Sequence, residues 1–432
     1  MSCTVHIYLV KAGLWGTIIN LLKKIIMKYY KILICCLAFS ACKNNPVSEN
    51  KDLRVIDVAG GVGKSRLVNL SEIADTIEYI PLQTTKESLV DHIFYNLIFY
   101  ENGVLYISQK SGSVKIFDRR GEYVNSIDRK GRGPQEYEQF SGIDVDVSTG
   151  NICIKGHCKI LEYTKDGHFV RRITFQDEDE SKGIDWFFFK KLGDFYIMTS
   201  FINKNSVYSA LIMDSTSRVI MKFNYPPEEI AFVKTLLRSF TFIDPQIFKY
   251  NGSIRLINGN NKYVLSINKD FSVDTAFIIN YGKYNVVNES PGKLFLSNSP
   301  YLWRQFNFFE SNNYLFMQFH VGPLTDKPAI TINSRGEKYV YPLSCSVFNK
   351  KTGEFIFLDQ PEINHFGFVE DLEGGPAIWP KYISADNYMI SYIPAHEFIA
   401  HAESNKVSEK FKAIASKLKE TDNPVIVRVK LK

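Results

Sequence analysis

The feature that most constrains the fold of this chain is an internal repeat. Residues 102–124 and 149–170 each contain two strands of alternating apolar and polar residues, followed by a charged turn that ends in glycine. The segments FDRRGEY, from Phe117, and YTKDGHF, from Tyr163, align at an offset of 46 residues. A unit of this length, built of short strands, is typical of one four-stranded blade of a β-propeller.

Weaker copies of the unit continue along the chain. We expect them at Phe195–Ser200 with Ser206–Met213, Ser253–Leu256 with Tyr263–Ile267, Tyr314–Phe319 with Ala329–Ile332, and Cys345–Phe348 with Phe355–Leu358. Six units then fit between Asp91 and the carboxyl terminus, and radial repetition hides strand edges that a flat sheet would expose. Aromatic residues make up 14% of the chain, and aromatic side chains are favoured on the half-buried faces of strands. We predict an all-β fold, a single six-bladed β-propeller of four-stranded blades with small helical insertions.

Both ends of the chain are expected to contribute to the final blade. The last eight residues, VIVRVKLK, form an alternating strand that is well placed to pair with Leu53–Val58 or with Ile77–Leu82. Such pairing would remove the weak seam of the ring. Helical periodicity is confined to Pro226–Phe240 and Ser408–Lys419, and we expect both segments to lie on the rim.

The amino terminus has the parts of a bacterial export signal. Met27 begins a segment with two lysines, an apolar run that ends at Phe39, and two small residues before Cys42. This order resembles a lipobox, in which the cysteine is lipidated, although Phe39 stands where leucine is usual. The alternatives are an uncleaved anchor helix or a buried cysteine. Residues 1–26 are read either as sequence upstream of the true start at Met27 or as part of a longer uncleaved signal.

These features divide the chain into three parts. Residues 1–42 are predicted to be the signal, residues 43–52 a polar tether, and residues 53–432 the propeller. The predicted location is the bacterial cell envelope, with a lipid anchor in the outer membrane and the domain on its periplasmic or surface side. The formal charge of +6 is modest and its lysines and arginines are scattered among acids, so no nucleic-acid partner is expected.

Three cysteines remain in the predicted domain. Cys153 and Cys158 flank four residues and could face each other across a hairpin as one disulfide, or they could be two packed thiols. Neither their spacing nor the nearby histidines make a zinc site.

A glycine-rich segment, AGGVGKS from Ala59 to Ser65, resembles the phosphate-binding loop of partitioning ATPases. The strict pattern needs glycine at Val58 and the variant needs lysine at Ala59, and strands rather than βαβ units follow. We therefore expect a loop before the first blade, and neither a nucleotide nor another cofactor.

Two loops supply the candidate ligand-binding residues. The first, GRGPQEY from Gly131, offers Arg132, Glu136 and Tyr137, and the second offers Asp371 and Trp379. Their charged and aromatic side chains could contact a polar ligand, a sugar or a protein. Equally, the glycines and prolines are explained by turn geometry, and the aromatic rings by packing between blades.

Catalytic motifs are not recognisable in the sequence. His396 and His401 are five residues apart, off the spacing of a helical zinc pair, and no GxSxG elbow is present. No catalytic residue and no metal ligand is therefore assigned. Ligands or a triad could still converge on a propeller axis from separate blades.

Four segments resemble the six-bladed β-propeller lipoproteins of gut Bacteroidota, a family related in form to NHL-repeat propellers. They are ADTIEYIPL from Ala74, GRGPQEY from Gly131, DLEGGPAIWPKYIS from Asp371, and NPVIVRVKLK from Asn423. With the repeats, the resemblance covers roughly residue 52 to the end. It implies the propeller and the envelope location, and it implies no catalytic residues.

Two hypotheses about function follow. The first is a non-enzymatic envelope lipoprotein that presents one propeller face to a protein or glycan. The second is a hydrolase or lyase with a polar or metal site in the axial channel, since a fold does not fix a function.

Overall fold

The structure is a computed structural model that describes residues 54–432 except 157, 175–185, 201–207, 228–229, 231–244, 260 and 286–299. The predicted signal with Cys42, the tether, and most of the predicted helix Pro226–Phe240 lie outside these residues. The described residues form one compact unit.

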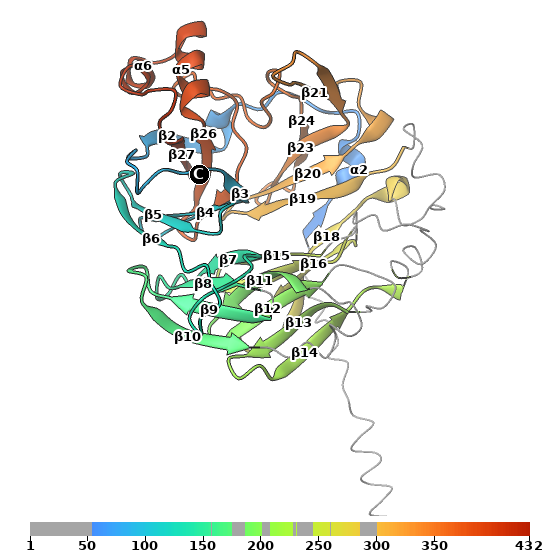
Figure 1. The fold of residues 1–432 in the computed structure, drawn as a ribbon. Coiled ribbons are helices and arrows are strands. Elements are labelled where there is room, and N and C mark those ends of the chain that lie inside the picture. Colours follow the sequence, from blue (N-terminus) through green and yellow to red (C-terminus); the bar gives the residue numbers. More distant parts are fainter. Residues whose placement is uncertain are drawn as a thin grey trace, which may run out of the picture. The chain divides into compact units, whose positions relative to one another are not determined.

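Six four-stranded blades, one of them extended by a fifth strand, form a propeller, which confirms the predicted fold class (Figure 1). Blade 1 holds β3 (Ile93–Glu101), β4 (Val104–Gln109), β5 (Val114–Asp118) and β6 (Tyr123–Ile127); blade 2 holds β7 (Gly142–Val145), β8 (Ile152–Lys155), β9 (Lys159–Tyr163) and β10 (Phe169–Thr174); blade 3 holds β11 (Trp186–Leu192), β12 (Phe195–Ser200), β13 (Tyr208–Asp214) and β14 (Val219–Asn224). Blade 4 holds β15 (Gln246–Tyr250), β16 (Ser253–Ile257), β17 (Tyr263–Ile267) and β18 (Val273–Ile279); blade 5 holds β19 (Trp303–Glu310), β20 (Tyr314–His320), β23 (Leu343–Asn349) and β24 (Phe355–Leu358); blade 6 holds β25 (Tyr382–Ile383), β26 (Tyr388–Ile393), β27 (Val425–Leu431) and β2 (Ala74–Pro81).

Blade 6 joins the two ends of the propeller. Its carboxyl-terminal strand β27 pairs antiparallel with β2, the second of the two expected partners. The first expected partner behaves differently, because β1 (Arg54–Ile56) adds to blade 4 as a fifth strand parallel to β18. The amino-terminal segment thus binds two blades before the first complete one begins.

The structure corrects the division of the last repeats. The segments at Tyr314–Phe319, Cys345–Phe348 and Phe355–Leu358 were expected in two units but belong to one blade. Between β20 and β23 the chain forms a separate hairpin of β21 (Ala329–Ile332) and β22 (Lys338–Tyr341). Local alternation marks each strand correctly, but it cannot show that a 22-residue connection (321–342) separates two paired strands.

A hydrophobic core lies between each pair of neighbouring blades. The core between blades 2 and 3 includes Ile160, Phe189 and Tyr196, for example, whereas that between blades 5 and 6 includes Phe316 and Trp379. The central strands of a blade are covered on both faces, which explains the continuous apolar runs in strands such as β12 and β20.

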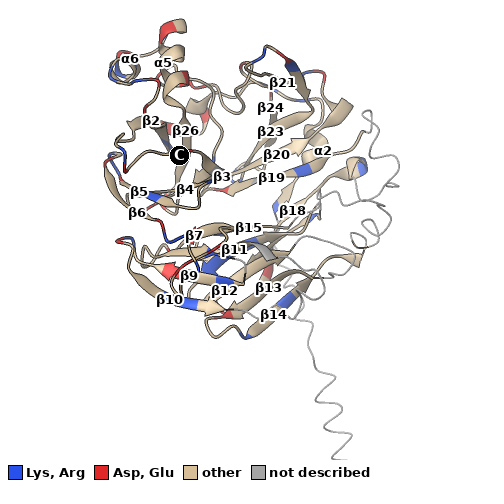
Figure 2. Ribbon diagram, viewed as in Figure 1, with Lys and Arg blue, Asp and Glu red and all other residues tan. Residues whose placement is uncertain are grey.

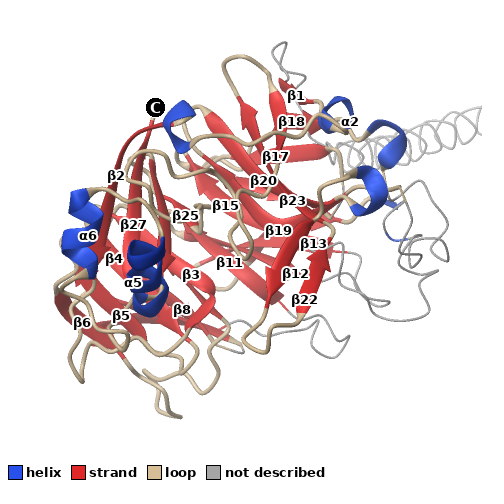
Figure 3. Ribbon diagram, turned by 90° about the horizontal axis from the view of Figure 1, so that it is seen from above, coloured by secondary structure: helices blue, strands red, loops and turns tan. Residues whose placement is uncertain are grey.

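Two helices cover blade 6 (Figure 3). Helix α6 (Glu409–Ala415) agrees with the predicted segment and is capped by the Ser408 side chain, whereas α5 (Ala395–Ser404) was not predicted. The ring of Phe398 in α5 stacks on that of Phe411 in α6 with centroids 3.9 Å apart. The shorter helical elements are α2 (Val58–Gly61), η1 (Leu70–Glu72), η3 (Gly282–Tyr284) and η5 (Gly322–Leu324). None of the helices within the described ranges is long and apolar enough to cross a bilayer.

The two ends of the strands carry different connections. Where the innermost strands end, turns of at most six residues lead to the next strand, the longest being 146–151. Where the innermost strands begin, the fully described connections include 128–141, 321–342, 359–381 and 394–424. We call the first end the turn face and the second the loop face. The hairpin β21–β22 and both long helices belong to the loop face.

Candidate functional site

The inner strands of blades 2, 3 and 4 bring charged side chains together near the turn face. Asp144 lies on β7, Lys190 and Lys191 on β11, and Lys249 on β15. Figure 2 shows acidic and basic residues side by side in this part of the molecule. Each residue lies one or two positions before the end of its strand. Because the innermost strands of neighbouring blades end at the same face, these side chains lie close together.

Asp144 connects three blades through its two carboxylate oxygens. Oδ1 lies 3.3 Å from Lys190 Nζ, and Oδ2 lies 2.5 Å from Lys249 Nζ and accepts a 2.8 Å hydrogen bond from the Lys191 backbone N–H. The Asp144 side chain is only 2% exposed. The Lys249 ammonium also donates to the Val145 carbonyl at 2.8 Å. Both oxygens of this carboxylate therefore contact partners from blades 3 and 4.

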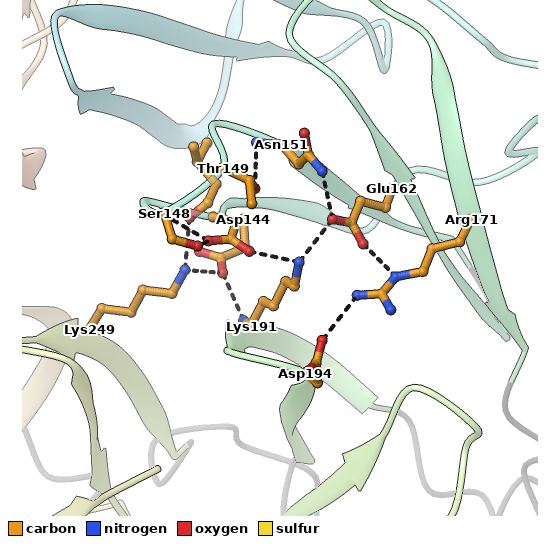
Figure 4. Close-up of polar contacts among 11 residues, drawn as sticks. Asp144, Ser148, Thr149, Asn151, Glu162, Arg171, Lys191, Asp194 and Lys249 are labelled. Carbon is orange, nitrogen blue, oxygen red and sulfur yellow. Dashed lines mark hydrogen bonds and ion pairs between the residues drawn. The ribbon is translucent and has the colours of Figure 1, made fainter.

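A second carboxylate extends the network outward (Figure 4). Lys191 Nζ lies 2.7 Å from Asp146 and 2.8 Å from Glu162 of β9. The other Glu162 oxygen accepts from Arg171 Nε at 2.7 Å. Arg171 also approaches the exposed Asp194 at 3.9 Å. The network thus runs from the axis to the edge of blade 2.

The hydrogen-bond partners of Asp146 and Glu162 favour the ionised state of these two acids. Burial acts to raise the pKa of Asp146, but hydrogen bonds from Lys191 and Ser148 outweigh it and lower the pKa to about 2. Burial is likewise outweighed at Glu162, whose pKa is lowered by Lys191, Asn151 and Arg171. Lys190 shows the reverse, since burial lowers its pKa more than Asp144 raises it.

Two further buried carboxylates lie at blade boundaries. Glu310 of β19 contacts Arg255 of blade 4 and Lys350 of its own blade, each at 2.8 Å. Glu101 of β3 accepts a 2.5 Å hydrogen bond from the Tyr382 hydroxyl of blade 6. Burial raises the pKa of Glu101 to about 7, although hydrogen bonds from Tyr382 and Ala385 oppose the rise.

The chemistry open to this arrangement is limited by its pairing. A nucleophile or general base needs a lone pair that can reach a substrate, whereas the oxygens of Asp144 and Glu162 already accept from lysine or arginine. Within the part of the chain that the structure describes, no group of three or more histidine, cysteine and acidic side chains is placed to hold a metal ion. The network is suited to joining blades 2, 3 and 4.

The first set of predicted site residues lies in the loop between blades 1 and 2. Arg132 is exposed, with a guanidinium 3.9 Å from Glu138. Glu136 accepts a 2.8 Å hydrogen bond from the Gly133 backbone N–H. Tyr137 is fully buried and donates to the Gly112 carbonyl at 2.8 Å. The Tyr137 ring thus packs between blades 1 and 2, the second of its two expected roles, whereas Arg132 is exposed on the loop face.

The second set lies between blades 5 and 6. Asp371 accepts hydrogen bonds from the backbone N–H of Ser71 at 2.9 Å and from the Ser71 hydroxyl at 2.5 Å. These bonds fix the amino-terminal segment to the loop between blades 5 and 6. Trp379 is 5% exposed and stacks on Phe368 with ring centroids 5.8 Å apart. Of the two expected roles of Trp379, this position corresponds to packing between blades 5 and 6. The structure does not bring the two predicted sets together.

Of the two alternatives for Cys153 and Cys158, the structure has separate thiols. Cys153 is fully buried on β8, in the core between blades 2 and 3, whereas Cys158 is half-buried just before β9. In the register of β8 and β9 the residue opposite Cys153 is Glu162, so the hairpin does not place the two sulfurs across from each other. Burial raises the pKa of the Cys153 thiol.

The glycine-rich segment Ala59–Ser65 has a packing role. Gly61 ends helix α2, and a Cβ added there would lie 2.7 Å from the Phe355 ring. The Gly60 N–H donates to Asp57, which caps the same turn at 3.1 Å. Gly61 therefore allows the chain to pass closely against blade 5, whereas Gly60 leaves room for the Asp57 cap.

The charged residues that join blades 2, 3 and 4, which we call the axial network, were not predicted from the sequence; they are Asp144, Asp146, Glu162, Arg171, Lys190, Lys191 and Lys249. One signal was present, since Asp144 and Lys190 stand inside otherwise apolar strands, where a charge needs a buried partner. The identity of the partners could not be read, because they come from three blades and lie up to 105 residues apart in the chain, as Asp144 and Lys249 do (249 − 144 = 105).

The family model described as a domain of unknown function, DUF4934, matches residues 53–430. The chain belongs to this family. The match covers all six blades and confirms the resemblance to a propeller family. No functionally curated protein matches the chain.

Solved structures agree with this fold. A Bacteroides fragilis protein named as exported has 17% identity and a TM-score of 0.59, with 88% of this chain and 99% of that one covered. A member of the DUF4221 family from Bacteroides vulgatus has 13% identity and a TM-score of 0.44, with 83% and 97% covered. BamB from Moraxella catarrhalis has 9% identity and a TM-score of 0.36, with 73% and 75% covered. At 17% identity, the likeness to the Bacteroides fragilis structure supports the fold alone, and the other two likenesses carry no argument.

Proposed function

We propose that this protein is a non-enzymatic lipoprotein of the bacterial envelope whose loop face binds a protein or a glycan. The observation that carries the proposal is the difference between the two faces. Binding residues tend to lie on variable connections held by a rigid scaffold, and the long connections emerge at the loop face.

The axial network supports binding over catalysis. Two of its acids, Asp146 and Glu162, are ion-paired and have lowered pKa values, as acids in structural networks do. Hydrolase or lyase chemistry in the channel is the alternative. It would require Glu101, whose pKa is about 7, to exchange its partners for a substrate.

Export and anchoring are part of the proposal. The segment from Met27 to Cys42 has the order of a lipoprotein signal, and a structurally similar Bacteroides fragilis protein is named as exported. Changing Cys42 to serine should abolish labelling of the full chain by a fatty acid, whereas Cys36→Ser should leave the labelling intact.

The binding face is tested by photo-crosslinking of the full chain in cells that export it. A photoreactive amino acid replaces either Arg132 on the loop face or Arg218 on the turn face. The two are matched, since each guanidinium is largely exposed and lies near one acid, Glu138 or Asp214. We expect a discrete adduct from position 132 alone. Sensitivity of the adduct to protease or to glycosidase would tell a protein from a glycan. Equal adducts at both positions, or none, would overturn the proposal.

A further inference from the structure

Hairpin β21–β22 carries the densest group of exposed apolar side chains on the described surface. Five of the thirteen large exposed hydrophobic residues lie on it or on the adjoining loop: Ile332, Tyr339, Val340, Tyr341 and Ile363, at 38 to 58% exposure. All four residues of β22 are exposed. Clustering of this kind marks interaction sites more often than scattered surface residues do.

The two edges of the hairpin differ. On β21, the outward backbone groups of Ile330 bond to Gln360 and Asn364, and the Ile332 N–H donates to the Asn364 side chain at 2.6 Å. This edge is therefore covered by the chain itself. The pairing of β21 with β22 then directs the N–H and C=O groups of Lys338 and Val340 outward from the other edge.

That second edge is open. Within the described ranges no hydrogen bond reaches the outward backbone groups of Lys338 or Val340. An open strand edge with exposed apolar side chains is a template for another strand.

We propose that β22 pairs antiparallel with β22 of a second copy of this chain, across a two-fold axis at Tyr339. Lys338 then faces Val340 of the other copy, which makes four backbone hydrogen bonds. The two Tyr339 side chains meet in a non-hydrogen-bonded pair, where side chains are closest and aromatic pairs stabilise. Glu337 faces Tyr341 of the other copy.

The sequence of β22 selects this register. Moving the axis to Val340 places Lys338 opposite Pro342, which has no N–H and whose carbonyl already accepts from Val321 at 2.7 Å. Moving it to Lys338 sets two lysines face to face and brings Gly336 of the turn, with φ of +78°, opposite Val340. In the selected register the lysines lie diagonally, and their long stems let the charges separate into solvent.

Sedimentation equilibrium of the full chain in density-matched detergent tests the pairing. A four-residue edge is small, so we expect a reversible dimer with a dissociation constant of about 10–100 µM. Tyr339→Lys and Tyr339→Glu should each weaken the dimer about tenfold or more, because each places like charges opposite each other. Tyr263→Lys, at an exposed tyrosine of β17, is the matched control and should leave the dimer unchanged.

The decisive arm mixes the two variants in equal amounts. Lysine in one copy then faces glutamate in the other only if the axis passes through position 339, so association should recover as a heterodimer. Circular dichroism of each variant checks that the fold is retained. A monomer throughout the concentration range, an undiminished Tyr339→Lys dimer, or a mixture that fails to associate would overturn the proposal. So would pairing of this edge with an extended strand of a different protein in place of the second copy.

Discussion

Two buried glutamates at blade boundaries have opposite electrostatic surroundings. Glu162 lies between blades 2 and 3, and Glu101 lies between blades 6 and 1. Both are nearly inaccessible, at 2% and 3% exposure. Glu162 accepts from Lys191, Arg171 and Asn151, whereas Glu101 accepts from the Tyr382 hydroxyl and the Ala385 N–H.

The comparison separates the effect of burial from that of a partner's charge. Burial raises the pKa of both carboxyls, but the lysine and arginine at Glu162 reverse the shift, while the neutral donors at Glu101 leave it at about 7. The boundary between blades 2 and 3 is therefore joined by an ionised acid. The closing boundary between blades 6 and 1 is more stable when its acid is protonated.

The largest effect is expected from Glu162→Gln. The change keeps the shape of the side chain but leaves Lys191 and Arg171 with one anionic partner fewer in a buried setting. We expect a loss of about 2–3 kcal/mol in the free energy of unfolding, measured by urea denaturation near neutral pH.

A double variant supplies the control for this loss. Glu162→Leu combined with Lys191→Met removes both charges of one ion pair and should cost less than the sum of the two single losses, because the two residues interact directly at 2.8 Å. If the double variant lost the sum of the two single losses, the two residues would not be coupled and the network would not join the blades.

The second-largest effect is expected at Glu101, where a substitution should raise the free energy of unfolding. The pKa of Glu101 is raised from 4.5 to about 7. The protonated Glu101 side chain therefore stabilises the folded state fully below pH 4.5, and this stabilisation is lost as the pH rises through 7. Glu101→Gln does not ionise and should be more stable than the natural chain by about 1–2 kcal/mol at pH 8, with little difference near pH 5.

Urea denaturation of both chains at several pH values measures this difference. Glu162→Gln serves as the contrasting variant. The lowered pKa of Glu162 means that its contribution is present above the ordinary glutamate value and is lost as the pH falls, so that its cost should shrink in acid. A Glu101→Gln variant that is less stable at pH 8 would show that the carboxylate is stabilised there after all.

The fold was largely predictable because its signals are local. Strand alternation and the turn at Gly121 and Gly167 recur within each unit, and both glycines have positive φ. The error in blade 5 arose where hairpin β21–β22 interrupts the repeat, since an inserted strand pair has the same local pattern as a blade strand. Helix α5 was missed because only a few of its residues, such as Phe398, face the core.

The candidate site was less predictable, for a physical reason. Residues such as Tyr137 and Trp379 look suited to binding because they are aromatic and lie beside glycines, but the same features suit packing between blades. The choice depends on what surrounds each ring in space. Asp144 shows the converse, because its three partners come from two other blades and no spacing in the sequence reveals them.

The smallest effect is expected at the exposed end of the Glu162 network. Asp194 is 83% exposed at its side chain and lies 3.9 Å from Arg171, a separation at which water and salt screen the attraction. Asp194→Asn should therefore change the free energy of unfolding by less than about 0.5 kcal/mol, and added salt should erase the change. Urea denaturation at low and high salt, beside Glu162→Gln, measures both quantities. A loss of stability close to that of Glu162→Gln would mean that Arg171 depends on Asp194 for its position. The boundary between blades 2 and 3 would then be stabilised by an exposed charge, whereas the comparison with Glu101 indicates that charges paired in the interior stabilise it.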